Sequence, residues 1–213
     1  MPARNRRGPL ARFIMLVAGM GLLGVGYYWG NRYQYSGPPP PIEGVLMRPP
    51  VALPGFELQD ADGLPFNLQE LADRWTLIAF GDLRQAQGHL AVSRMIGVHN
   101  RLADQPERQR TLRLALAAED QDPALARDFS RLSPALKAIS GDTAELQRLR
   151  AAVGDLSTAQ DSSRGDEGAP LYLIDPKARL LALFPATQEP GAIAADLAAL
   201  ADRPDLLEEA AHE

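Results

Sequence analysis

Short apolar runs alternate with amphipathic segments along the chain from residue 54 onward, which predicts a mixed α/β fold. Residues 75–80 form a continuous apolar run followed by glycine, the pattern of a strand buried on both faces of a sheet. Residues 112–118 predict the next strand, although their Ala and Leu content would equally suit a helix. Two β-hairpins are expected from apolar segments that flank turn-rich sequence, namely residues 56–58 with 65–68 and residues 170–175 with 180–184.

Helical spacing of apolar residues fills the intervals between these strands. Helices are expected at residues 85–103, 124–132, 144–152 and 190–201. Pro123 suits the first turn of the second helix, and Thr143 suits the cap of the third. A polar loop is expected at residues 105–110, and a loop rich in Ser, Asp and Gly at residues 155–168 is expected to be mobile.

The order of these elements is hairpin, strand, helix, strand, helices, hairpin and helix. Parallel strands joined by helices and closed by an antiparallel hairpin indicate the α/β class, here a thioredoxin-like sandwich with an N-terminal hairpin extension. We assign this domain to residues 54–203 and an acidic tail to residues 204–213.

The strongest apolar run lies near the N-terminus. Residues 13–29 carry no charge and would span roughly 25 Å as a helix, and they follow a basic segment at residues 1–12. The positive-inside rule predicts that residues 1–12 are cytoplasmic, that residues 13–30 form a single transmembrane helix, and that the remainder faces the periplasm from the bacterial inner membrane. A cleaved signal peptide is the alternative, but aromatic residues stand where a peptidase requires small ones, which favours an anchor.

A proline-rich linker is expected between the anchor and the domain. Residues 31–53 include four consecutive prolines at 38–41, and a proline run favours an extended spacer.

Composition narrows the chemistry. The formal net charge is -5, and the 22 Lys and Arg residues do not gather into a stripe beyond the first few residues, so nucleic acid is not an expected partner. The chain has no cysteine, which excludes disulfides, thiolate metal sites and thiol nucleophiles. Its 3 histidines lack the spacing of a zinc hydrolase.

Three stretches stand out in the domain: PGFEL at residues 54–58, WTLIAFG at residues 75–81 and YLIDP at residues 172–176. They resemble the Sco/SenC family, the thioredoxin-like accessory proteins of cytochrome c oxidase assembly. In this family a C-x-x-x-C motif follows the central strand, and a distant histidine precedes the Tyr-Leu-Ile strand. The resemblance implies that Gln85 and His89 occupy the two cysteine positions and that Glu167 stands near the histidine position.

All three family ligands are therefore replaced. Soft thiolates select Cu(I), so the resemblance implies a divergent member with no catalytic residue, no cofactor and no metal at Gln85, His89 and Glu167. A different metal site formed by His89, Glu167 and His99 is an alternative to exposed helix positions that only solvate the surface. Pro170 is either the cis-proline of thioredoxin-like folds or an ordinary strand-edge proline.

The resemblance implies a non-catalytic, membrane-anchored accessory protein that assists respiratory oxidase assembly through contacts with the oxidase or its assembly factors. Two alternatives remain open. One is a structural or accessory subunit of another periplasm-facing membrane complex, and the other is a degenerate thioredoxin- or peroxiredoxin-like protein.

Overall fold

The computed structural model describes residues 19–22, 42–119, 122–154 and 168–203. Residues 19–22 are helical, and within the described ranges no helix has the length and apolarity needed to cross a bilayer. The predicted transmembrane helix at residues 13–30 otherwise lies outside these ranges, as do the basic segment at residues 1–12 and the acidic tail at residues 204–213. The chain divides into two compact units, and the fold below is that of the second, residues 40–213.

The described residues of this unit form one mixed sheet of eight strands in the order β1-β8-β7-β4-β5-β6-β2-β3. Strands β4, β5 and β6 are parallel, and every other neighbouring pair is antiparallel. The strands are β1 (Val45–Ala52), β2 (Glu57–Asp60), β3 (Pro65–Asn67), β4 (Trp75–Gly81), β5 (Leu112–Ala118), β6 (Leu136–Ser140), β7 (Leu171–Ile174) and β8 (Arg179–Phe184). The helices are α2 (Leu68–Leu71), α3 (Ala86–Arg101), α4 (Pro106–Thr111), α5 (Pro123–Ser130), α6 (Thr143–Gly154) and α7 (Pro190–Ala201).

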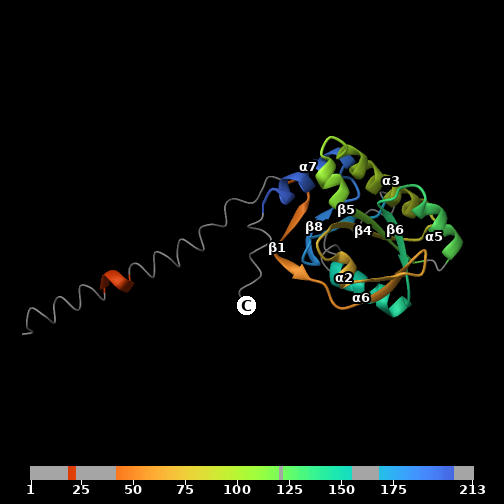
Figure 1. The fold of residues 1–213 in the computed structure, drawn as a ribbon, viewed down its shortest axis with the longest axis horizontal. Helices are drawn as coiled ribbons and strands as arrows, with labels where there is room; N and C mark the ends of the chain where they lie inside the picture. The colour runs from red at the N-terminus through yellow and green to blue at the C-terminus, as the bar shows by residue number, and fades with distance from the viewer. Residues whose placement is uncertain (1–18, 23–41, 120–121, 155–167, 204–213) are drawn as a thin grey trace, which may run out of the picture. The chain divides into compact units, whose positions relative to one another are not determined.

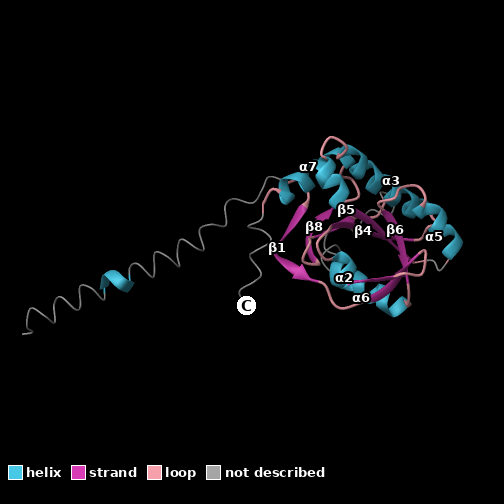
Figure 2. Ribbon diagram, viewed as in Figure 1, coloured by secondary structure: helices cyan, strands magenta, loops and turns pink. Residues whose placement is uncertain are grey.

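Helices cover both faces of the sheet, and each face has its own core (Figure 1). Helices α3, α5 and α7 pack on one face, and α2 and α6 pack on the other. Successive residues of β4 alternate between the cores, because Leu77 and Ala79 face the first helix layer while Ile78 and Phe80 face the second. Figure 2 shows the resulting helix, sheet, helix arrangement, which is the thioredoxin-like sandwich predicted from the sequence.

The predicted central strand is confirmed, since every residue of β4 except the last is buried. Residues 112–118 are a strand rather than a helix, and they pair in parallel with β4 over their whole length. Both hairpins form, as β2 with β3 and as β7 with β8. The four expected helices correspond to α3, α5, α6 and α7; the bounds of α7 agree with the prediction, and the end points of the other three differ by one to two residues.

Three elements depart from the sequence prediction. Strand β1 lies within the range assigned to the linker, and its two prolines fall where the pairing with β8 shifts register, between Leu46 and Val51. Prolines are tolerated there because the irregularity needs no N–H donor from them. Strand β6 was not predicted, because its five residues include Lys137 and Ser140, and helix α4 replaces the expected loop at residues 105–110.

Two local predictions also change. The cap of α6 is Asp142 rather than Thr143, because its Oδ1 accepts a hydrogen bond of 2.7 Å from the Ala144 N–H. Among the described residues the cis peptide bond is Arg48–Pro49, so the bond before Pro170 is trans, and the cis alternative for Pro170 is wrong.

Candidate functional site

A tight loop joins β4 to α3, and it is here that the resemblance puts the two family cysteine positions. Asp82 organises it, because its Oδ1 accepts from the Arg84 N–H at 2.8 Å and its Oδ2 accepts from Gln85 Nε2 at 3.0 Å. Gln85 is the N-cap residue of α3, with an exposed side chain that makes no hydrogen bond to the first turn. The Gln85 side-chain amide is thus directed back onto its own loop.

His89 lies in the next turn of α3, and neighbouring residues of the chain also hold its side chain in place. Its Nε2 lies 2.6 Å from the carbonyl oxygen of Leu83, and its ring packs against Phe129 of α5 with the centroids 5.0 Å apart. If Nε2 donates this bond, only Nδ1 remains as a nitrogen ligand. Gln85 and His89 therefore both lie at the start of α3 as exposed residues, and the side chain of each contacts the loop that precedes the helix.

Gly88 sets how closely the loop and α3 approach. A Cβ at this position would lie 2.2 Å from the Asp82 carbonyl oxygen, so any larger residue would push the first turn away from β4. This close approach is what brings the Leu83 carbonyl within reach of His89.

The loop that precedes β7 reaches the same helix from the other side. Glu167 lies outside the described residues, but Gly168 follows it, and a Cβ at Gly168 would lie 4.0 Å from the Cβ of Leu90. Arg94 of α3 fixes this segment, since its Nη1 donates to the Ala169 carbonyl at 2.7 Å and its Nη2 donates to the Pro185 carbonyl at 2.7 Å. Burial lowers the pKa of Arg94, against the opposing charge of Glu189.

The alternative metal site does not assemble. His89 and His99 are ten residues apart on the single helix α3, which separates them by about 15 Å along its axis at ~1.5 Å per residue. One ion cannot bind both side chains at ligand distances near 2 Å. Within the described ranges, no three side chains of His, Asp or Glu gather as a metal site would require.

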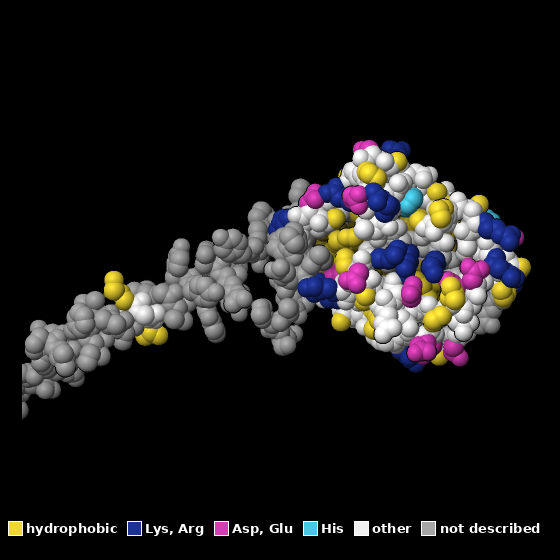
Figure 3. All heavy atoms as spheres, viewed as in Figure 1, with side chains coloured by type: hydrophobic (Ala, Val, Ile, Leu, Met, Phe, Trp, Pro, Cys, Tyr) yellow, Lys and Arg dark blue, Asp and Glu magenta, His cyan; other side chains and the backbone are white. Residues whose placement is uncertain are grey.

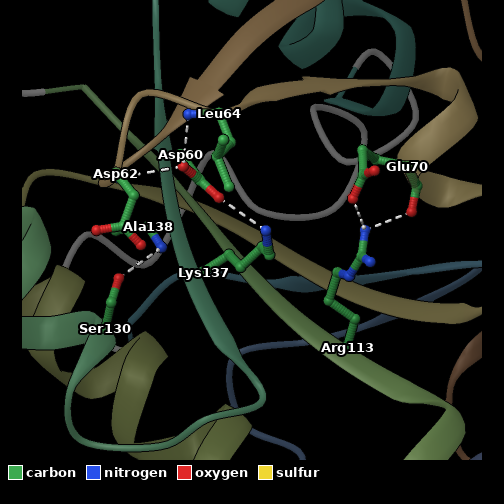
Figure 4. Close-up of polar contacts among 8 residues, drawn as sticks. All are labelled: Asp60, Asp62, Leu64, Glu70, Arg113, Ser130, Lys137 and Ala138. Atoms are coloured by element: carbon green, nitrogen blue, oxygen red, sulfur yellow. Dashed lines mark hydrogen bonds and ion pairs between the residues drawn. The ribbon is translucent and has the colours of Figure 1, made fainter.

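A second polar cluster lies at the opposite ends of the parallel strands and joins the N-terminal hairpin to the sheet (Figure 4). Lys137 of β6 donates to Asp60 of β2 at 2.7 Å, and Arg113 of β5 lies 3.3 Å from the carboxylate of Glu70 and over the ring of Phe66. Burial opposes ionisation of Asp60, but hydrogen bonds from Lys137 and two backbone N–H groups outweigh it and lower the pKa of Asp60. We assign this cluster a structural role.

Charges of both signs are mixed on the described surface of the domain. Figure 3 shows basic and acidic side chains interspersed over the described residues of the face in view, without a continuous basic stripe.

Sequence reasoning missed two residues that organise the site and its surroundings. Arg94 interrupts the apolar stripe of α3 between Val92 and Met95, and Asp196 stands among apolar residues in α7. A charge within an apolar helical pattern is the signal that could have located both, because such a side chain is buried only when it is paired.

The fold is that of a thioredoxin-like protein, and hydrogen bonds of Asp82 and His89 hold the loop after its central strand. The sequence model of the SCO1/SenC family matches residues 48–202, so the chain belongs to that family and the resemblance is confirmed. No curated protein matches the sequence.

Solved structures agree with this family. ScoI from Bradyrhizobium japonicum with copper bound is 21% identical, with a TM-score of 0.53, over 70% of this chain and 98% of its own. Yeast Sco1 with copper bound is 16% identical, with a TM-score of 0.57, over 72% and 94%. BsSco, a member of the Sco family of cytochrome c oxidase assembly proteins with a disulfide switch, is 14% identical, with a TM-score of 0.56, over 73% and 96%. At these identities the likeness shows the fold alone.

Proposed function

We propose that this chain is a non-catalytic member of the SCO1/SenC family, anchored in the bacterial inner membrane, that assists cytochrome c oxidase assembly by protein contacts. The observation that carries the proposal is the self-contained loop after β4. Gln85 and His89 stand at the family cysteine positions, and each is bound to its own loop rather than directed at a shared metal position.

Chemistry supports a role without copper transfer. Tight Cu(I) sites use thiolate ligands, and this chain has none. Thiol exchange requires a sulfur nucleophile, which is missing for the same reason. The surface at the start of α3 remains available for contacts, and it includes Leu90, whose side chain is 49% exposed.

The proposal is tested by deleting the gene and measuring assembled oxidase with and without added copper. We expect less assembled oxidase, with no recovery when copper is supplied, because the missing activity is a protein contact. The full chain should restore assembly, and a chain with Leu90→Asp should not. Leu64→Asp is the matched control, since Leu64 is 57% exposed in the β2–β3 turn, away from α3. Recovery by copper alone would contradict the proposal.

A structural subunit of another membrane complex is the second candidate. It is distinguished by purification of the tagged full chain in mild detergent, where a subunit co-purifies in a fixed ratio with its complex and an assembly factor does not.

A further inference from the structure

The segment that leads from the N-terminal unit into the sheet lies across the edge of the fold as a strap, residues 42–52. It pairs with β8 only at its two ends, where Leu46 faces Ala182 and Val51 faces Leu180. Residues 47–50 therefore stand opposite a single residue of β8. Because the pairing is interrupted there, contacts from other elements also help to hold the strap in place.

Asp196 of α7 provides such a contact. Its carboxylate accepts hydrogen bonds from the Glu43 N–H at 3.1 Å, from the Gly44 N–H at 2.9 Å and from Gln188 Nε2 at 2.8 Å. Asp196 is only 5% exposed, and all three of these donors are neutral. Gly44 fits closely beside Phe184, because a Cβ there would lie 2.6 Å from the phenyl Cδ1.

The same network continues to the candidate site. Gln188 accepts at its backbone carbonyl from Arg94 Nη2 at 3.1 Å, and Arg94 also binds the carbonyl of Ala169 beside the start of α3. Within the described part of the chain, two buried atoms of this network have no hydrogen-bond partner, the donor Arg94 Nε and the acceptor Gln188 Oε1. The Gln188 side chain can therefore adopt a second conformation once its hydrogen bond to Asp196 is broken, because this network still holds an unpaired donor and an unpaired acceptor.

We propose that the strap is releasable and that Asp196, Gln188 and Arg94 couple its release to the segment at residues 168–170, which lies beside Leu90 of α3. Through this network, a change in the position of the strap would change the position of residues 168–170 at the candidate site. This inference goes beyond the proposed function and does not depend on which protein the site contacts.

The experiment measures amide hydrogen exchange of the full chain in detergent, comparing the parent with Asp196→Ala. We expect exchange at Glu43 and Gly44 to rise at least tenfold, and exchange in residues 168–174 to rise about threefold. Asp202→Ala is the matched control, because Asp202 follows the same helix with its side chain 67% exposed, and it should change neither segment. The amides of β4 report global unfolding and should stay protected.

Two further variants test the coupling independently of Asp196. Gly44→Ala displaces the strap by steric overlap with Phe184 and should loosen residues 168–174, although it keeps the side chains of Asp196, Gln188 and Arg94. Arg94→Met acts from the other end and should accelerate exchange at Glu43 and Gly44, because coupling between two sites is reciprocal. The proposal is overturned if either release of the strap leaves residues 168–174 unchanged, or if Arg94→Met leaves the strap protected.

Discussion

His89 Nε2 lies 2.6 Å from the carbonyl oxygen of Leu83, so the residue that the resemblance puts at the second family cysteine position binds the backbone of the loop that precedes it. A metal bridge or disulfide would tie this loop to α3 through sulfur. Here an imidazole and the carboxylate of Asp82 hold the loop instead.

His89→Ala should lower the free energy of unfolding by about 1 kcal/mol, because it removes one hydrogen bond and the contact with Phe129. Gln85→Ala, the matched exposed position, should change it by less than about 0.5 kcal/mol. Urea denaturation of the domain measures both. Equal effects of the two variants would show that His89 has no special structural role.

Restoring the family ligands tests the alignment of the site. The triple variant Gln85→Cys, His89→Cys and Glu167→His should bind Cu(I) tightly when titrated against a competing chelator, because it places two thiolates at the start of α3. The parent should bind only weakly through exposed histidine. Tight stoichiometric binding by the parent would refute the non-catalytic proposal, and no binding by the variant would refute the alignment.

Ile78→Asp should unfold the domain. Ile78 is 3% exposed at the centre of β4, so an unpaired carboxylate there costs several kcal/mol, comparable to the whole stability of many domains. Circular dichroism melting measures the loss. Leu64→Asp, at an exposed turn, is the control and should melt close to the parent.

Lys137→Met should destabilise the domain by about 2 kcal/mol at pH 7, because it leaves the buried carboxylate of Asp60 without its cation. The pKa of Asp60 is lowered in the fold, so its contribution to stability is present above the ordinary value of 3.8 and is lost as the pH falls through the lowered pKa. The difference between parent and variant should therefore narrow below pH 3.8 in denaturation series.

The control for this series is Arg131→Met, which breaks an exposed pair with Asp128 and should cost less than about 0.5 kcal/mol at any pH. A pH-independent difference for Lys137→Met would contradict the assignment to Asp60.

The topology prediction is tested with a reporter fused after Glu213. A periplasmic reporter should be active, and the mature protein should begin at Met1 or Pro2. A mature N-terminus after Trp29 would identify a cleaved signal peptide in place of the anchor.

Much of the fold could be read from strongly patterned segments. The continuous apolar run of β4 predicts only a buried strand. The turn that begins at Asp175 predicts the hairpin of β7 and β8. In this turn the buried Asp175 carboxylate also binds Arg179 at 2.6 Å. Strand β1 could not be predicted, because Pro49 and Pro50 argue against a strand unless the register shift opposite β8 is known. Strand β6 could not be predicted either, because Lys137 interrupts its apolar pattern and the partner that neutralises it, Asp60, is 77 residues away in the sequence.

The site was predictable only in its positions. The family resemblance singled out Gln85 and His89, but their bonds to Asp82 and Leu83 depend on the close approach that Gly88 allows. Arg94 and Asp196 act between elements distant in sequence, with Arg94 reaching 75 residues to Ala169. Spacing along one chain carries no information on such contacts.

Proline stands at both outer strands of the sheet, in the middle of β1 and at the start of β3. Proline has no N–H to offer a neighbouring chain, so neither border presents a complete row of donors on which another copy could add a strand. The sheet is thereby protected against edge-to-edge aggregation. This protection matters most at high protein concentration, because the protein has no disulfide bond that could hold its edge strands in place.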